Sequence, residues 1–286
     1  LTTVVIFLGS IGYCGYISLT ENQPGFFIRM SIEAFLSSRS EYADGTHEVI
    51  YPAKNDGIQT EMRDLYFADK SDVKETVVYC YVIGSDLEDS MGLASYNLSE
   101  IIEATKQGDS LKFVIQAGGS RRWFTEGFSY NTIGRYEIKN GEVTLVQKLD
   151  DKTCMSEQST LDAFLTWANT NYPADRKMLV LWNHGGGVMG YGLDELNDPA
   201  TGIGILSVAD IATSLKNSNS RFDLIDFDAC LMQTLEVAYC LEPYTDYLLG
   251  SEETEPGLGQ YYTLPFGQLA KDPTLSTIDF AQMMCS

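Results

Sequence analysis

Basic residues are scarce in this chain of 286 residues. Lys and Arg number 19 against 40 Asp and Glu, which gives a formal net charge of −21. This negative excess disfavours nucleic acid and anionic lipid as electrostatic partners, and it favours a basic partner or substrate. The imbalance is steepest from His184 to Ser286, where three basic residues face fifteen acidic ones. The role of the negative charge therefore depends on residues in that last third of the chain.

Histidine and closely spaced cysteine are also in short supply. The chain has two histidines, His47 and His184, and its six cysteines form no CxxC pair. A metal site built on zinc is therefore not expected, because zinc sites need clustered His and Cys ligands. With 44% hydrophobic residues the chain can bury a core that does not depend on disulfides. We expect most cysteines to be small buried residues, and one or two incidental disulfides remain an option outside the cytosol.

The first twenty residues lack charge altogether. Residues 1–20 are uncharged and largely apolar, and they are about as long as a segment that spans a bilayer. We favour a signal peptide or membrane anchor here over a buried strand or helix, which predicts an extracytoplasmic protein that is membrane-anchored or secreted. Residues 21–74 mix Pro, Gly, Ser and charges with short apolar runs, which indicates a spacer or pro-segment.

Long apolar runs appear beyond residue 74, and they alternate with helical patterns. Runs rich in β-branched and aromatic residues are typical of strands that are buried on both faces in a parallel sheet. Asn140-Gly141 predicts a tight turn in an antiparallel hairpin over 135–149. The fold class is therefore α/β, with a mostly parallel central sheet covered by helices and an added β-hairpin. The predicted strands are 76–84, 111–117, 178–183, 222–227 and 247–250, and the predicted helices are 87–107, 157–171, 207–216 and 231–241.

Two reactive side chains follow two of these predicted strands. His184 comes directly after 178–183, and Cys230 lies three residues after 222–227. The carboxyl ends of parallel strands meet at one edge of a sheet, where ligands bind. An imidazole beside a thiol can take its proton or pair with the thiolate, which makes the cysteine a nucleophile. The sequence between them fits a single crossover, so the two side chains are predicted to lie together.

Glycines follow the histidine, and a predicted helix follows the cysteine. The run Gly185-Gly186-Gly187 lets the backbone approach a substrate closely. We expect the N–H groups of Gly185 and Cys230 to form an oxyanion hole, and the N-terminus of helix 231–241 to favour the thiolate. Taken singly, the cysteine could be a core residue, the histidine a structural hydrogen-bonding group and the glycines a flexible loop. Their joint order at two strand ends favours catalysis.

The segments LVLWNHGGG (179–187) and DFDACLM (226–232) resemble the two catalytic motifs of clostripain-like cysteine peptidases. That family belongs to the caspase-like clan, with gingipains, legumains and separases, and the resemblance extends over residues 76–262. It implies a caspase-like three-layer sandwich, with a catalytic domain over 75–286 that is cut short at its C-terminal end. It also implies a cysteine endopeptidase that requires no cofactor and cleaves proteins or peptides after Arg or Lys.

The resemblance assigns roles to individual residues. Cys230 is the nucleophile, and His184 is the general base or the partner of the thiolate. Asp228 lies by the substrate pocket and would hold a basic side chain, which is what a fixed carboxylate does well; the alternative is a helix N-cap. The acidic loop 251–255 would form a wall of the same pocket, or else an ordinary solvated loop. The predicted substrate-binding residues are thus Asp228, Ser251, Glu252, Glu253 and Glu255.

Calcium and two other functions stay open. Some relatives need calcium, and Asp194, Glu195 and Asp198 form an oxygen-rich cluster, but their spacing lacks a recognised calcium-loop pattern. A non-catalytic extracytoplasmic binding module could keep this fold without turnover. A transpeptidase or ligase could use the same Cys-His dyad with an amine in place of water.

Overall fold

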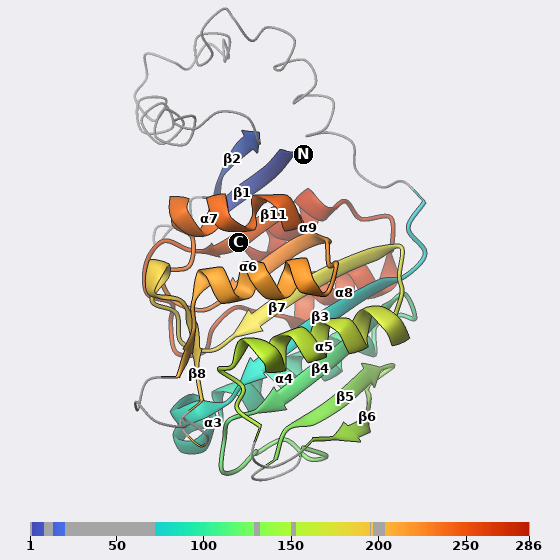
Figure 1. Cartoon of the computed structure of the whole chain (residues 1–286). Helices are drawn as coiled ribbons and strands as arrows, with labels where there is room; N and C mark the ends of the chain where they lie inside the picture. The colour runs from blue at the N-terminus through green and yellow to red at the C-terminus, as the bar shows by residue number, and fades with distance from the viewer. Residues whose placement is uncertain are drawn as a thin grey trace, which may run out of the picture.

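The computed structural model describes residues 2–8, 14–20, 72–128, 132–149, 153–194, 196 and 204–285. Most of the predicted spacer, together with Glu195 and Asp198, lies outside the described residues. Figure 1 shows the whole chain, with its sheet running through the middle of the described part.

A nine-stranded sheet forms the centre of the described fold, in the order β2-β1-β11-β10-β7-β3-β4-β5-β6. From β1 to β4 along that order, neighbouring strands run parallel. The hairpin β5–β6 is added antiparallel at one edge, and β2 is antiparallel at the other. The mostly parallel sheet and the added hairpin are therefore confirmed. The strands are β1 (Thr2–Leu8), β2 (Cys14–Thr20), β3 (Thr76–Ile83), β4 (Leu111–Gly118), β5 (Gly134–Lys139), β6 (Glu142–Lys148), β7 (Arg176–Trp182), β10 (Phe222–Asp228) and β11 (Thr245–Ser251). A separate small pair consists of β8 (Tyr191–Leu193) and β9 (Ile205–Leu206).

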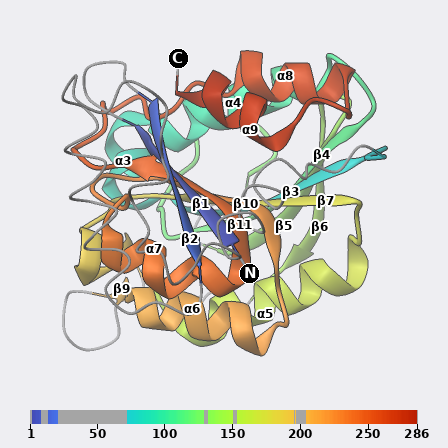
Figure 2. The same ribbon diagram turned by 90° about the horizontal axis from the view of Figure 1, so that it is seen from above.

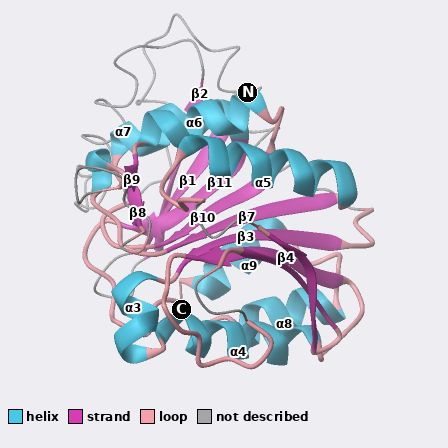
Figure 3. Cartoon of the chain, turned by 60° about the horizontal axis from the view of Figure 1, so that its bottom comes forward, coloured by secondary structure: helices cyan, strands magenta, loops and turns pink. Residues whose placement is uncertain are grey.

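Helices cover both faces of the sheet. One layer holds α5, α6 and α7, and the other holds α4, α8 and α9, with the sheet between them (Figures 2 and 3). The helices are α3 (Ser85–Met91), α4 (Leu93–Thr105), α5 (Gln158–Asn171), α6 (Val208–Asn217), α7 (Leu235–Leu241), α8 (Thr263–Lys271) and α9 (Thr277–Met284), with short 3₁₀ turns at Gly187–Met189 and Glu242–Tyr244.

Strand β3 is buried at every position, and nearly all of its residues are apolar or aromatic. Val77 and Tyr79 enter the core under α5 and α6, whereas Val78 and Cys80 enter the core on the α4 side. Successive side chains of a strand point to opposite faces, so a strand covered on both sides must be apolar at every position. This burial gives the three-layer arrangement its two hydrophobic cores.

Two helix predictions were wrong at their boundaries. The predicted helix 87–107 is broken at Gly92, whose φ of +68° belongs to the left-handed region that glycine adopts readily. The predicted helix 231–241 begins only at Leu235, because Leu231 has a φ of +63° and Thr234 caps the helix by accepting a hydrogen bond from the N–H of Val237. Cys230 therefore lies in a turn and does not head the helix.

The apolar N-terminal segment supplies β1 and β2. Strand β1 pairs in parallel with β11, so its backbone belongs to the sheet. None of the helices in the described residues is long and apolar enough to cross a bilayer. A role of this segment in targeting stays a prediction.

Side chains are described for five of the six cysteines, and their burial differs. Cys80 and Cys154 are buried, as expected for small apolar residues, while Cys230 and Cys285 are partly buried. Cys240 is exposed, which departs from the expectation of general burial.

Candidate active site

His184 follows β7, and its neighbour Asn183 holds the chain in place. Asn183 is buried, and its amide donates to the carbonyl of Ile83 at 2.5 Å and to Oγ of Ser85 at 2.9 Å. Its side-chain oxygen accepts the N–H of Leu193 at 2.7 Å. The side chain thus joins the ends of β3 and β7 to the β8 segment, which fixes the backbone directly before His184. The imidazole itself is 45% exposed, so a substrate can reach it.

The imidazole of His184 contacts Asp86, a residue that the sequence analysis did not identify. Nε2 of His184 lies 2.8 Å from Oδ1 of Asp86. Partial burial disfavours ionisation of Asp86, but its hydrogen bond and charge interaction with His184 outweigh this effect and lower its pKa. A signal was available, because Asp86 follows the predicted strand 76–84 at the same edge of the sheet. The missing information was that β3 and β7 are neighbours.

Cys230 lies beyond the end of β10, which pairs directly with β7. Trp182 and Asp228 are partners in the register of these parallel strands, so His184 and Cys230 each follow this pair by two residues. Gly185 is packed against Cys230: a Cβ added there would lie only 2.1 Å from the carbonyl oxygen of Cys230. The two loops are therefore in contact, and only glycine fits at position 185.

The N–H of Gly185 is directed by a small antiparallel bridge. Gly185 faces Tyr191 in this bridge, which is held by the N–H of Gly186 to the carbonyl of Gly190 and by the N–H of Gly192 to the carbonyl of His184. In an antiparallel pair of this kind the facing residues do not exchange hydrogen bonds with each other. The bridge therefore fixes Gly185 without using its N–H, which suits a donor to an oxyanion.

The thiol of Cys230 receives a hydrogen bond from another loop. The N–H of Glu255 lies 3.2 Å from Sγ of Cys230. The same loop is tied to the nucleophile turn, because the N–H of Leu231 donates to the carbonyl of Glu253 and the N–H of Gln233 donates to the carbonyl of Ser251, each at 3.0 Å. The hydrogen-bond donor to Sγ is therefore a backbone N–H of the loop after β11. The loop after β11 thus replaces the helix N-terminus that the sequence had suggested.

Asp228 is not a helix N-cap, because it is the last residue of β10 and is buried. Its carboxylate accepts the hydroxyl of Tyr262 at 2.7 Å and the N–H of Gln260 at 3.2 Å. The carboxyl of Glu255 also forms a hydrogen bond with it. Asp226 lies two residues earlier on the same face of the strand, where it accepts the side-chain amide of Gln260 at 3.0 Å.

Burial of these acids changes their protonation. Burial and the neighbouring charge of Asp228 raise the pKa of Glu255 from 4.5 to about 10. Burial also raises the pKa values of Asp226 and Asp228, although the hydrogen bonds that Asp228 accepts oppose the rise. At neutral pH the carboxyl of Glu255 is therefore protonated and donates a hydrogen bond to Asp228.

Several acceptors in this acidic cluster are unsatisfied. Among the described residues, Oδ2 of Asp226, Oε1 of Glu255 and Oε1 of Gln260 are buried without a hydrogen-bond partner. Buried acceptors normally have partners, so these three oxygens indicate a place for a donor-rich group. Asp226 could have been found from the sequence, because residues i and i+2 of a strand share a face; Gln260 and Tyr262 carry no such signal.

The other predicted wall residues lie differently. Ser251 is buried, and its hydroxyl accepts the N–H of Glu253 at 3.2 Å, so it serves its own loop. The side chains of Glu252 and Glu253 are exposed. Burial and the charge of Glu253 raise the pKa of Glu252. Of the loop acids, Glu255 is the one whose contacts reach both Cys230 and Asp228.

The described residues contain no group of three or more His, Cys, Asp or Glu side chains arranged to hold a metal ion. Asp194 is buried, and its carboxylate accepts the N–H of Met155 at 2.8 Å and that of Leu196 at 3.0 Å. Because Glu195 and Asp198 lie outside the described residues, a need for calcium stays a prediction.

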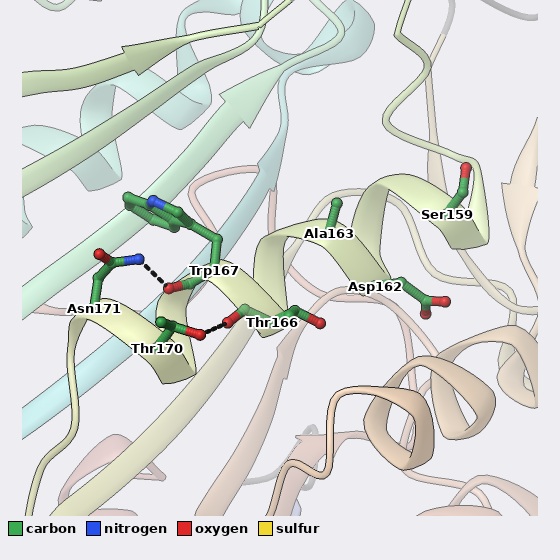
Figure 4. Close-up of a pocket in the computed structure, with 7 residues that line it drawn as sticks. All are labelled: Ser159, Asp162, Ala163, Thr166, Trp167, Thr170 and Asn171. Atoms are coloured by element: carbon green, nitrogen blue, oxygen red, sulfur yellow. Dashed lines mark hydrogen bonds between the residues drawn. The ribbon is translucent and has the colours of Figure 1, made fainter.

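A surface pocket of about 560 Å³ lies on α5, and it shares no lining residue with the predicted site (Figure 4). Two of its polar side chains bond within their own helix, because Thr170 donates to the carbonyl of Thr166 and Asn171 to that of Trp167. Asp162 instead accepts the side-chain amide of Asn217 on α6. The pocket is thus separate from the edge of the sheet that holds His184 and Cys230.

Comparison with known proteins places this arrangement in context. A family model described as the clostripain family matches residues 80–286. Clostripain from Hathewaya histolytica is 25% identical over 269 residues, which cover 82% of this chain and 49% of that protein. The chain thus spans about half the length of this curated relative.

Solved structures of similar fold are also known. A secreted C11 cysteine protease from Bacteroides thetaiotaomicron, in complex with an irreversible peptide inhibitor, has a TM-score of 0.56 and 25% identity, covering 72% of this chain and 57% of that one. An inactive zymogen C11 protease from Parabacteroides distasonis has a TM-score of 0.53 and 22% identity, covering 69% of this chain and 54% of that one. The second likeness supports the fold alone.

Proposed function

The chain belongs to the clostripain family, and from this we propose that it is a cysteine endopeptidase that cleaves after Arg or Lys. The observation that carries the proposal is the contact between the two loops that follow β7 and β10. Gly185 lies against the carbonyl of Cys230, and His184 and Cys230 occupy equivalent positions after neighbouring strands. This arrangement brings an imidazole, a thiol and an available backbone N–H to one edge of the sheet.

The reaction uses groups of the chain alone. The proton of the Cys230 thiol passes to His184, and the thiolate attacks the scissile carbonyl carbon. The N–H groups of Gly185 and Cys230 hold the oxyanion that forms. The imidazolium then protonates the leaving amine, and water hydrolyses the thioester with His184 as base, which restores the thiol.

The buried acids provide the specificity for a basic side chain. Asp228 lies two residues before the nucleophile, and three unsatisfied acceptors surround it. A guanidinium carries five N–H donors in a planar fork and can serve several carboxylate and amide oxygens at once. A Lys ammonium would satisfy fewer of them, so we expect Arg to be preferred to Lys.

Glu255 occupies this pocket when substrate is absent. Its protonated carboxyl bonds to Asp228, and its N–H bonds to Cys230. An arriving cation would take the place of the shared proton on Asp228, and movement of the loop would release Sγ for attack. Glu252 and Glu253, on the exposed side of the loop, add negative potential for the approach of a basic chain, while Ser251 fixes the loop.

The place of action proposed here is outside the cytoplasm. One structural relative is described as a secreted C11 protease. Protein or peptide substrates with basic residues follow from the family and the acidic site. Detection of the chain in culture medium or in the cell envelope fraction would test this location, and retention in the cytosol would contradict it.

The decisive experiment compares peptide reporters that end in Arg, Lys or Asp. We expect hydrolysis of the Arg and Lys reporters by the wild type and loss of turnover in Cys230→Ala and His184→Ala. Asp228→Asn should lower kcat/KM for Arg and Lys reporters selectively, because the cation loses its carboxylate. Equal residual activity in Cys230→Ala would refute the mechanism.

Two controls separate the alternative functions. A thiol-reactive peptide probe carrying Arg should label Cys230 in an active peptidase, whereas a non-catalytic binding module would leave it unlabelled. With an added amine nucleophile the hydrolysed product should stay dominant, whereas a dominant ligated product would indicate a transpeptidase.

A further inference from the structure

The contact between His184 and Asp86 adds a residue to the proposed catalytic machinery. We infer that Asp86 is a positioning residue: its carboxylate holds the imidazole of His184 through Nε2, so that Nδ1 faces the reaction. This inference rests on the proposed function of the same site. The motivating observation is the 2.8 Å separation of Nε2 and Oδ1, between residues that lie 98 positions apart in the sequence.

The fold fixes Asp86 at this position through its neighbours. Ser85 directly precedes it, is buried, and has a φ of +47°, which L side chains adopt rarely. The N–H of Ser85 donates to the carbonyl of Gly119, and its Oγ accepts the amide of Asn183, the residue before His184. One side chain, Asn183, therefore links the backbone before the acid to the backbone before the imidazole. The backbone at Ser85 is strained and anchored on both sides, which suits the orientation of the Asp86 carboxylate that follows it.

The choice of nitrogen follows from this contact. A neutral imidazole can accept a proton on only one nitrogen, and a carboxylate that accepts from Nε2–H selects the tautomer with a free lone pair on Nδ1. Nδ1 can then take the proton of the Cys230 thiol. The resulting imidazolium keeps Nε2–H on the Asp86 carboxylate and delivers the Nδ1 proton to the leaving amine. No proton needs to pass to Asp86 at any step.

A neighbouring acid shows what an ordinary surface carboxylate does here. Asp89 lies three residues further on α3, and it faces Arg121 and Arg122 at 3.9 and 4.0 Å. These longer contacts are loose surface ion pairs. Asp86 instead meets a single imidazole at hydrogen-bond distance, so its contact is directional. Because Asp89 shares the helix, it provides a matched control.

The test uses variants of the full chain. Asp86→Asn removes the charge but keeps the size, Asp86→Ala removes the side chain, and Asp89→Asn removes a charge from the same helix. We expect kcat for an Arg reporter to fall roughly ten- to a hundredfold in both Asp86 variants, with KM changed less than about threefold. The loss is smaller than the roughly 10⁴-fold effect of a buried triad aspartate, because the side chain of Asp86 is 46% exposed. Asp89→Asn should keep the wild-type kcat.

A pH profile and a conservative variant provide readouts that a merely structural role would leave unchanged. The acidic limb of the kcat/KM profile should move to lower pH in Asp86→Asn, because the base loses the carboxylate that favours its protonated form, and it should stay in place in Asp89→Asn. Asp86→Glu keeps a carboxylate at an exposed position, so it should retain more activity than Asp86→Asn.

Failure of this inference differs from failure of the proposed function. Wild-type kcat and an unshifted pH limb in Asp86→Asn, with Cys230→Ala inactive, would overturn the role of Asp86 and leave the peptidase intact. Absence of turnover in the wild type, without labelling of Cys230, would overturn the peptidase itself. If Asp86→Ala unfolds, the Asn variant still decides, because it preserves the volume of the side chain, and the Glu variant adds only one methylene at a half-exposed position.

Discussion

Replacing Glu255 by glutamine should stabilise the fold, and the gain should grow with pH. The pKa of Glu255 is raised from 4.5 to about 10 because its carboxyl is buried beside Asp228. Between these values the unfolded chain releases the proton while the folded chain keeps it. The unfolded state therefore binds fewer protons, and the free energy of unfolding falls as pH rises from 4.5 toward 10. An amide mimics the protonated carboxyl and removes this loss.

The expected magnitude follows from the interval in pH. Each pH unit between the two pKa values changes the free energy of unfolding by about 1.4 kcal/mol. Glu255→Gln should therefore exceed the wild type by about 1 kcal/mol at pH 5 and by about 3 kcal/mol at pH 7. Below pH 4.5 the carboxyl is protonated in both states, so the difference should disappear.

The assay is urea unfolding at pH 5 and pH 7, followed by tryptophan fluorescence and far-UV circular dichroism. Glu253→Gln provides the control, because its side chain is exposed on the same loop and should change stability by less than about 0.5 kcal/mol at either pH. An equal difference between Glu255→Gln and wild type at both pH values would refute the reasoning.

Two further predictions concern the loop that carries His184. Gly185→Ala should lower the free energy of unfolding by about 1–3 kcal/mol and reduce turnover at least tenfold, because its Cβ would lie 2.1 Å from the carbonyl oxygen of Cys230. Wild-type turnover together with an unchanged urea midpoint would contradict the contact between the loops. Asn183→Ala should lower the free energy of unfolding by about 2–3 kcal/mol, because the N–H of Leu193, the carbonyl of Ile83 and Oγ of Ser85 lose their partner. Thermal melting would check this, and an unchanged Tm would argue against the role of Asn183 in joining the strand ends.

The sheet could be predicted from the sequence because its strands are buried on both faces. The run 76–84 corresponds closely to β3, and 222–227 to β10, since runs dominated by apolar and β-branched residues favour buried strands. The neighbouring positions of β7 and β10 followed from the crossover between them. The α/β class and the family were confirmed on this basis.

What could not be predicted depends on contacts between distant segments. The place of Asp86 after a predicted strand does not by itself reveal its partner, because its contact with His184 exists only once β3 lies beside β7. The helix boundary at Leu235 was missed because nothing in the composition of the turn announces that Leu231 adopts a left-handed conformation. Glu255 could not be chosen among the loop acids, because the direction of its side chain is set by the buried Asp228.

The position of Asp228 within β10 has a consequence for how such a site can evolve. The floor of the proposed pocket is made of core strand residues, whereas its wall is a surface loop after β11. A change of substrate charge at the floor would alter a position that also holds Tyr262 and Gln260 in place, so stability would change with preference. Changes at the exposed loop positions Glu252 and Glu253 are free of that constraint. Evolution or protein engineering should therefore change the preference for substrate residues next to the cleavage site easily. A new preference for the charge of the substrate side chain should require compensating substitutions in the core.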